Sequence, residues 1–468
     1  MTKSLLLLTS ALLASGCAVT SRPVAPPADA PAAFRYGDAA SFSAEPAAAD
    51  PWRLFGDPVL DRLLAQARMH NHDLRQAEAT LAEALALRDA SLWRLAPGGG
   101  GEAGLNRGRD SVVESGLADP PVQERWLAGF DATWEIDLFG RLRSRAAAAA
   151  AGLGAAAASR AEVLTTVEAE VAANYFAWRE AEENLLRLGA QSRSLEQSLA
   201  HVRHRLTAGR GTELDVARVE TLLRETEALL PVQRARLAGL HHRLAVLVGA
   251  SPSTFELPVA VAPPWTERVV ALGNPSNLLR RRSDVRFAER ALAREVALRD
   301  SDVAALFPEV SVRGVLRFAG LSSGTVGDRE TRAWSVAPSV RWNLLDLGRL
   351  RAQVRAGDAR VDGAVARYEQ TVLNALADVE TALARYRAAL ERSDLLAARL
   401  QAADRALGHA RRQEAAGAAD PLAVLDAERV ALVAERDLIA AQAERNLTLV
   451  ALFKALGGGV AVDGEPAP

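Results

Sequence analysis

Few side chains in this sequence are arranged for catalysis or metal binding. Cys17 is the only cysteine, so no intramolecular disulfide can form. The sequence contains no HExxH, Walker A or CxxC motif. His201 and His204 could share one helix face, but without a clear further ligand they are expected to be surface histidines. We therefore predict a protein that is not an enzyme and that binds no metal or other cofactor.

One short segment, LAVLDAER, combines an apolar residue with an ion pair. Leu422 and Asp426 are four residues apart, and Arg429 follows Asp426 by three, so these side chains can share one face of a helix. The simplest interpretation is a solvated Asp–Arg pair, which contributes only a few tenths of a kcal/mol. Whether the segment does more depends on the elements that carry it.

Composition limits the kind of protein that this can be. The formal net charge is −2 and the pI about 6.4, so bulk charge gives no reason to expect nucleic acid as a partner. Apolar residues make up 49% and aromatic residues only 5%, a mixture rich in Ala, Leu and Arg that favours long helices. A chain of 468 residues is too long for one ordinary core, so two or more units are expected.

The first residues form a targeting signal. Lys3 precedes a short apolar run, too short to span a bilayer, that is typical of a secretory signal peptide at 1–16. The motif LASGC resembles a bacterial lipobox, which implies that Cys17 carries covalent diacylglyceryl and N-acyl lipid; an ordinary signal with an incidental cysteine is the alternative. Ala18 in place of Asp implies sorting to the outer membrane. Residues 17–50, rich in Ala and Pro, are expected to be an extended linker.

The rest of the chain is a tandem duplication. WEIDLFGRLR returns 208 residues later as WNLLDLGRLR, and DLRQAEATLAEALALRD returns 211 residues later as DVRFAERALAREVALRD. The change in offset means that the first copy carries three extra residues between Pro97 and Trp134. We place the two repeats at 51–257 and 258–456, followed by a flexible tail at 457–468.

Both repeats predict the same order of elements: a helix, a β-hairpin, a very long helix, a tip that contains glycine, and a final helix. The hairpins are expected at about 98–139 and 309–345, and the long helices at about 141–206 and 349–415. The tips are expected at about 207–213 and 415–421, and the final helices at about 213–249 and 421–456. A 66-residue helix is about 100 Å long. Its apolar residues recur by three and four, which indicates a coiled-coil seam that needs partner helices.

The hairpin segments alternate between apolar and polar residues. One face of the second hairpin carries Val310, Val312, Leu316, Phe318, Trp334, Val336, Val340, Trp342 and Leu344. Such alternation, with Trp at both ends, is the pattern of membrane-spanning strands; two hairpins on a soluble protein are the alternative. Because open sheet edges are not tolerated in lipid and two hairpins supply only four strands, several chains must pool their strands.

Together these motifs resemble the outer-membrane efflux protein family of TolC-type channels. Within it they are most similar to the lipoprotein (NodT-like) branch that serves resistance-nodulation-division multidrug pumps. The resemblance covers about 50–456 and rests on four motifs: WRLFGDPVLDRLL, LLRRRSDVRFAER, WEIDLFGRLR and LDAERV. In the second of these, Ser283 stands where the family usually has Pro. The family implies an α+β membrane protein: a homotrimer with a 12-stranded outer-membrane β-barrel, four strands per chain, that continues into a long periplasmic α-helical coiled-coil barrel. It further implies a passive conduit whose partners are outer-membrane lipids, a periplasmic adaptor protein and an inner-membrane pump, with most of the mass in the periplasm.

The resemblance assigns roles to the tips and to the segment after the second tip. The tips, where Gly reverses the chain and Thr or Asp caps the next helix, would contact the adaptor through Gly209, Arg210, Gly211, Thr212, Leu214, Gly417, Asp420 and Pro421; plain turns are the alternative. Leu422 would be the apolar constriction of a periplasmic gate, Asp426 a ring of carboxylates and Arg429 their partner. The repeat places Arg218 at the first-copy position of Asp426, so we expect the two to couple neighbouring helix hairpins in the closed state.

The sheet and its exits carry the remaining predicted residues. The strand-to-helix junctions are marked by Trp134, Gly140, Trp342 and Gly348, and each Gly is expected to turn the strand into the long helix. Arg313, Arg317 and Arg341 fall on the charged strand face and would line the barrel lumen, where they either hydrate the pore or select ions.

Three other functions fit parts of the sequence. The same tunnel could serve type I protein secretion or metal-ion efflux, and a structural periplasm-spanning lipoprotein would need no conduit. The alternating hairpins argue against the last, because a spacer needs no strands that face lipid. The drug-pump branch is favoured by the motifs LASGC and LLRRRSDVR. Metal-ion efflux is less favoured, because two methionines and few histidines supply no series of metal-binding side chains along the tunnel. The sequence does not identify the exported compound.

Overall fold

The computed structural model describes residues 31–37, 41–43, 45, 50–257, 269–416, 418 and 421–458. Cys17, the expected signal peptide and most of the expected linker lie outside the described residues, as do Gly417 and Asp420 of the second tip. The chain divides into two compact units, and each draws on both repeats. The first unit contains 80–157 and 287–369, and the second contains 29–79, 158–286 and 370–468.

Each repeat supplies two shorter helices, one very long helix and a final helix. In the first repeat these are α2 (Pro58–His70), α3 (His72–Trp93), α5 (Arg141–Thr207) and α6 (Glu213–Leu247). In the second they are α7 (Pro275–Arg281), α8 (Ser283–Ala304), α9 (Leu347–Ala415) and α10 (Pro421–Ala455). The single helix expected before each hairpin is two helices, because Asn71 and Arg282 have extended backbone. Asn71 then caps α3 by accepting the Leu74 N–H.

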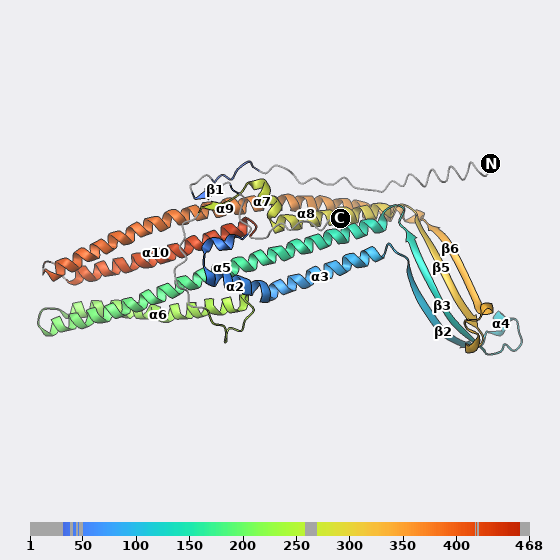
Figure 1. The fold of residues 1–468 in the computed structure, drawn as a ribbon, viewed down its shortest axis with the longest axis horizontal. Coiled ribbons are helices and arrows are strands. Elements are labelled where there is room, and N and C mark those ends of the chain that lie inside the picture. The colour runs from blue at the N-terminus through green and yellow to red at the C-terminus, as the bar shows by residue number, and fades with distance from the viewer. Residues whose placement is uncertain are drawn as a thin grey trace. The chain divides into compact units, whose positions relative to one another are not determined.

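The first unit contains a four-stranded antiparallel sheet with the order β2-β3-β5-β6 (Figure 1). Its strands are β2 (Gly98–Gly108), β3 (Gln123–Ile136), β5 (Glu309–Gly320) and β6 (Arg332–Arg341). The two hairpins therefore meet through β3 and β5, and β2 and β6 form the free edges of the sheet. β6 ends at Arg341, so Trp342 and Leu344, which we expected in this strand, lie beyond it; Leu344–Asp346 form a short 3₁₀ helix, η4.

The registers of the two hairpins reproduce the duplication. Ala103 lies opposite Ala128 in the first hairpin, and Gly314 lies opposite Val336 in the second. These pairs are related by the offsets of 211 and 208 residues that relate the two copies of the sequence. The three extra residues therefore fall in the loop between strands, which spans 109–122 in the first hairpin and 321–331 in the second. The first loop also contains a one-turn helix, α4 (Val112–Ser115).

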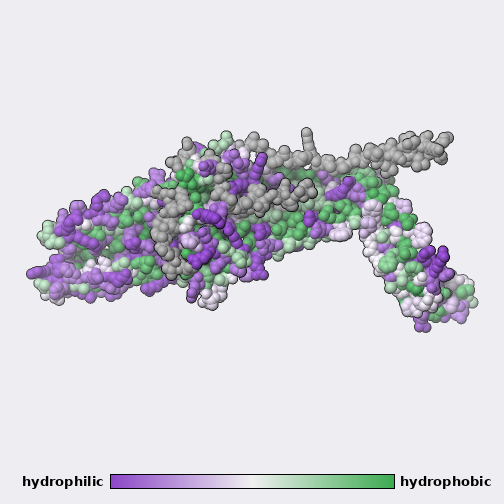
Figure 2. Space-filling model, in the orientation of Figure 1, coloured by the Kyte–Doolittle hydropathy of each residue, from purple (hydrophilic) through white to green (hydrophobic). Residues whose placement is uncertain are grey.

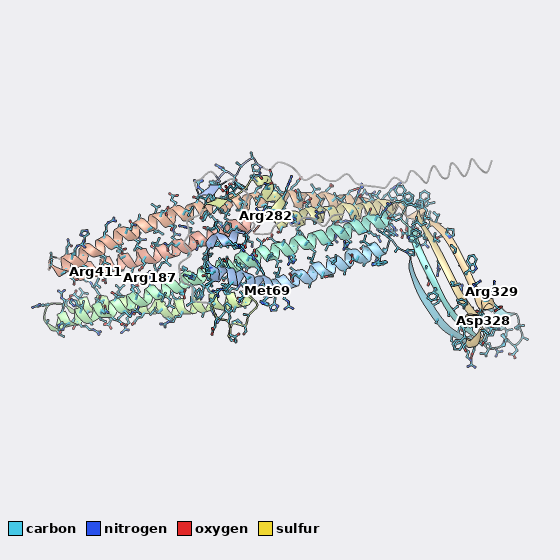
Figure 3. All side chains as sticks on the ribbon, in the orientation of Figure 1. Met69, Arg187, Arg282, Asp328, Arg329 and Arg411 are labelled. Atoms are coloured by element: carbon cyan, nitrogen blue, oxygen red, sulfur yellow. The ribbon has the colours of Figure 1, made fainter. Side chains whose placement is uncertain are left out.

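The second unit has its main core where α2 crosses the long helices. Trp52, Phe55 and Leu60 are buried against Tyr175 and Phe176 of α5, together with apolar residues of α6, α9 and α10. Within this unit α5 with α6, and α9 with α10, run as antiparallel pairs (Figure 1). Arg187 of α5 pairs with Glu435 of α10 at 3.0 Å, and Arg411 of α9 pairs with Glu428 of α10 at 2.7 Å (Figure 3).

Two buried carboxylates in this core hold α2 on α5. Glu168 accepts hydrogen bonds from Trp52 Nε1 at 2.8 Å and from Arg68 Nε at 2.6 Å. Asp57 accepts one from the Tyr175 hydroxyl at 2.6 Å. Burial is the main cause that raises the pKa of Tyr175, followed by its hydrogen bond to Asp57.

Among the described residues, none of the helices combines the length and apolar character needed to cross a bilayer.

Candidate functional site

The register of the sheet gathers its apolar residues on one face. Phe130 lies opposite Leu316, which in turn lies opposite Trp334, and Trp134 lies opposite Val312. This face remains open in the chain: 69% of Phe130 and 71% of Trp334 are exposed. Figure 2 shows apolar residues exposed along the sheet and around the strand-to-helix junctions. An apolar sheet face of this extent needs an apolar surrounding, because water-exposed patches of large side chains are unfavourable.

The opposite face carries the charged residues. Arg313, Arg317 and Arg341 all occupy positions of this face: Arg313 lies opposite Thr133 and Ala337, and Arg317 opposite Gly129 and Ala333. The Arg313 guanidinium is 3.9 Å from the Asp131 carboxylate on the neighbouring strand. Because strand residues alternate between faces, these arginines and the apolar residues above are on opposite sides of one sheet. Their role in a lumen stays a prediction.

The two strand-to-helix junctions share one hydrogen bond, from a Trp side chain to a backbone carbonyl. Trp134 Nε1 donates to the Leu95 carbonyl at 2.9 Å, and Trp342 Nε1 donates to the Leu306 carbonyl at 3.1 Å. Both carbonyls lie just past the end of the helix that precedes the hairpin, where backbone acceptors lack a helical partner. Each Trp of the repeated motif thus fixes the last part of the hairpin to the helix that enters it.

The glycines of the two junctions differ. Gly140 has φ +85°, a backbone conformation that favours glycine, and it makes the turn into α5 as expected. Gly348 instead lies inside α9, and the turn is made by η4. The second junction forms a 3₁₀ turn before the helix begins, so no residue there has to adopt the left-handed conformation that favours glycine.

The first tip is a tight helix reversal. Gly209 has φ +70°, and the Thr212 hydroxyl accepts the Asp215 N–H at 3.2 Å while the Asp215 carboxylate accepts the Thr212 N–H at 2.9 Å. These reciprocal bonds form a capping box at the start of α6. Arg210 is held by a backbone bond to Arg205, and Leu214 is exposed. In the part of the second tip that the structure describes, the Ala418 N–H donates to the Gln413 carbonyl.

Removing this cap tests how much the capping box contributes to the stability of the first tip. Thr212→Ala is expected to cost about 1 kcal/mol at the start of α6, because it removes the acceptor of the capping box. Hydrogen exchange of the first-turn amides should accelerate, whereas Thr212→Ser should retain protection. The hydrogen bonds from Thr212 hold the pKa of Asp215 below its ordinary value, so the contribution of the Asp215 carboxylate to the capping box is present above that ordinary value and is lost as the pH falls through the lowered one. Equal exchange in Thr212→Ala and the wild type would contradict the prediction.

The predicted gate residues lie near the start of α10. Arg429 donates to Asp426 at 3.1 Å, and the side chains of both residues are more than half exposed. Leu422 is half-buried one turn before Asp426. Arg218 is exposed on α6, and among the described residues of the chain no ion pair joins it to Asp426. Any coupling between Arg218 and Asp426 must therefore involve another copy of the chain.

One residue with many contacts was missed by the sequence analysis. Arg282, in the motif LLRRRSDVR, donates to Asp284 and Asp378 and to the carbonyls of Ala375 and Ala455 (Figure 3). It thereby joins the α7–α8 break to α9 and to the end of α10. The motif LLRRRSDVRFAER contains Arg282, and its run of three arginines is the signal that could have pointed to a charged contact. A cavity of about 1020 Å³ lies beside it in the second unit and is lined by charged groups of both signs.

Comparison with known proteins identifies the family of this chain. A family model described as outer membrane efflux protein matches residues 63–250 and 274–458. The solvent efflux pump outer membrane protein SrpC of Pseudomonas putida is 29% identical over 412 residues, 87% of either chain. The outer membrane protein OprJ of Pseudomonas aeruginosa is 30% identical over 443 residues, 94% of this chain and 91% of OprJ.

A solved structure supports the same assignment. The outer-membrane channel OprN matches with a TM-score of 0.88 and 33% identity, over 94% of this chain and 99% of that chain. The predicted fold class, a TolC-type outer-membrane channel built from strands and long helices, is thereby confirmed. The likeness covers both repeats, the sheet and the long helices, so it is not confined to one motif. The chain belongs to the outer membrane efflux protein family.

Proposed function

We propose that this chain is the passive outer-membrane conduit of a tripartite efflux system and that it works as a homotrimer. The observation that carries the proposal is the sheet with one exposed apolar face and two free edges, β2 and β6. Free edges expose unpaired backbone groups, and lipid offers these groups no hydrogen-bond partner. Pairing β6 of one chain with β2 of the next would satisfy both edges, and three chains would close a barrel of twelve strands.

The partners follow from this arrangement. A conduit with no energy source of its own needs a pump in the inner membrane and an adaptor that bridges the periplasm. The adaptor would contact the two tips, around Thr212 and Leu214 in the first and around Pro421 in the second. Cys17 would carry the lipid anchor, on the strength of the LASGC motif. The protein would have no catalytic role, because its family is one of channels and transport components.

The substrates would be small apolar toxic compounds. SrpC is named for solvent efflux, and that name supports organic solvents as the class carried here. Substrate choice would rest mainly with the pump and the adaptor, which load the conduit. The gate would consist of Leu422, Asp426 and Arg429, with Arg218 as the partner from a neighbouring hairpin.

Reconstitution of the full-length protein into planar bilayers tests the conduit. The wild type is expected to insert and give discrete conductance steps. Phe130→Arg puts a charge on the apolar face and should reduce insertion, since burying a cation in the bilayer core costs free energy. Thr133→Arg is the matched control, because it makes the same change of charge on the opposite face of the same strand. Equal insertion of the two variants would show that the apolar face does not contact lipid and would overturn the proposal.

A further inference from the structure

In each repeat, the break between the two shorter helices holds the end of the final helix. In the first repeat, the Asn71 side-chain amide donates to the Leu247 carbonyl at 2.8 Å. In the second, the Arg282 guanidinium donates to the Ala455 carbonyl at 3.1 Å. The offsets of 211 and 208 residues relate the two donors and the two acceptors. The two copies therefore share one contact but make it with different side chains.

The backbone around the two breaks is the same. The angles φ and ψ are −63° and 131° at Asn71, and −66° and 126° at Arg282. The helices that follow the breaks, α3 and α8, both have 22 residues, and the final helices α6 and α10 both have 35. The two side chains thus start from equivalent positions, and they differ in charge and in how far they reach.

Arg282 also makes a second contact that another residue makes in the first repeat. There, the Glu170 carboxylate of α5 pairs with Arg243 of α6. The equivalent residues of the second repeat are Asp378 on α9 and Ala451 on α10, so the final helix has no cation at this position. Arg282 supplies the cation instead, and its guanidinium lies 3.0 Å from the Asp378 carboxylate.

One side chain of the second repeat therefore holds both helices of the α9–α10 pair. Arg282 contacts α9 through Asp378 and the end of α10 through the Ala455 carbonyl. In the first repeat, Asn71 and Arg243 divide the equivalent contacts between them. Loss of Arg282 would release both helices at once, whereas loss of either residue of the first repeat would release one contact.

The cavity of about 1020 Å³ beside Arg282 lies where the final helix lacks its arginine. Ala451 lines this cavity together with Asp378 and Lys454. Because no described side chain fills this space, packing contributes less to the alignment of α9 and α10 here than in a filled interface. The alignment therefore depends more on the polar contacts of Arg282.

We propose that Arg282 is a positioning residue of the gate, because it sets the angle between α9 and α10 and thereby the place of Asp426 near the other end of α10. This inference rests on the proposed function, since it requires a conduit whose gate contains Asp426. Asp426 and Ala455 are separated by about 44 Å of helix, so a tilt of roughly 5° at Arg282 would move Asp426 by about 4 Å. Such a shift is enough to separate an ion pair, whose charged atoms lie within about 4 Å of each other.

Single-channel conductance of the full-length protein in planar bilayers tests this role. Asp378→Asn removes the partner of Arg282 on α9 but leaves the contact with the Ala455 carbonyl. It should raise the conductance several-fold, as Asp426→Ala is expected to do. Arg282→Asn places the amide of the first repeat at the second break, where it is too short to reach α9, and it should raise the conductance as well.

A double variant transfers the arrangement of the first repeat to the second. Arg282→Asn with Ala451→Arg puts the amide at the break and the guanidinium on the final helix, beside Asp378. Its conductance should return towards the wild-type value. Arg280→Asn, at an exposed position of α7, and Asp394→Asn, at an exposed position of α9, are the matched controls and should leave the conductance unchanged.

Thermal unfolding of the same variants separates the positioning of the gate from the stability of the fold. If Asp378→Asn and Arg282→Asn lower the unfolding midpoint but not the closure of the channel, while Asp426→Ala opens it, the gate stands and the positioning role is wrong. A folded double variant that keeps the raised conductance also contradicts this role. If neither the wild type nor Asp426→Ala conducts ions, the proposed function fails, and the positioning role fails with it.

Discussion

Arg282→Ala is expected to destabilise the protein by about 3 kcal/mol, the cost of breaking a largely buried ion pair. The Arg282 side chain is only 11% exposed, and its removal leaves Asp284 and the carbonyls of Ala375 and Ala455 without this donor. Burial disfavours the charge on Arg282, but the two carboxylates outweigh burial and raise its pKa. The estimate takes the lower end of the usual range because Asp378 is more than half exposed.

Thermal unfolding of the purified full chain, followed by circular dichroism, measures this effect. The midpoint should fall clearly in Arg282→Ala and less in Arg282→Lys, because an ammonium group cannot reproduce the forked contacts of the guanidinium. Arg280→Ala is the matched control, since Arg280 is exposed on the same short helix. A midpoint for Arg282→Ala equal to that of Arg280→Ala would show that the contacts of Arg282 contribute nothing to stability.

Asp426→Ala is expected to raise the single-channel conductance several-fold. In the part of the chain that the structure describes, Asp426 forms an ion pair with the exposed Arg429 three residues later, and such pairs contribute little. A large effect therefore requires that Asp426 acts between copies, as a ring of carboxylates that holds the periplasmic end closed. Asp394→Ala removes the same charge from an exposed position on α9 and should leave the conductance unchanged.

Exchanging the charges of Arg218 and Asp426 tests whether Arg218 is the partner of the carboxylate ring. Arg218→Asp should also raise the conductance if Arg218 of a neighbouring hairpin pairs with Asp426. The double variant Arg218→Asp with Asp426→Arg should then return the conductance towards the wild-type value. Unchanged conductance in Arg218→Asp would remove Arg218 from the gate, and unchanged conductance in Asp426→Ala would remove the gate itself.

Much of the fold follows from patterns within short stretches of sequence. The period-two alternation around Phe130 and Leu316 predicted which side chains share a face, and the register places the two residues opposite each other. The offsets between the repeats predicted three extra residues, which the structure places in the first loop. Gly209 and Thr212 predicted the first tip because left-handed backbone and helix capping are decided by a few neighbouring residues.

The features that were missed depend on partners far along the chain. The carbonyls that Arg282 contacts belong to residues 93 and 173 positions away, and no local pattern indicates them. The bond from Trp134 to the Leu95 carbonyl was hidden for the same reason. Gly348 was misplaced because the alignment of the repeats assumed the same backbone conformation at both junctions. Gly140 is left-handed, whereas Gly348 is already helical and η4 makes the turn before it.

The matching registers of the two hairpins carry information about symmetry. Because a chain already contains one junction between repeats, β3 with β5, it holds a template for the junction that it would make with its neighbour in the proposed homotrimer. Ala132 lies opposite Gly314 there, and the repeat offsets of 208 and 211 convert this pair into Val340 opposite Ala103 of the next chain in the proposed homotrimer. Both residues lie on the apolar face, so this pairing preserves sidedness around the ring. In that homotrimer, the duplication would place every second junction between repeats within one chain, and each chain would pair with a copy of a surface that it already contains.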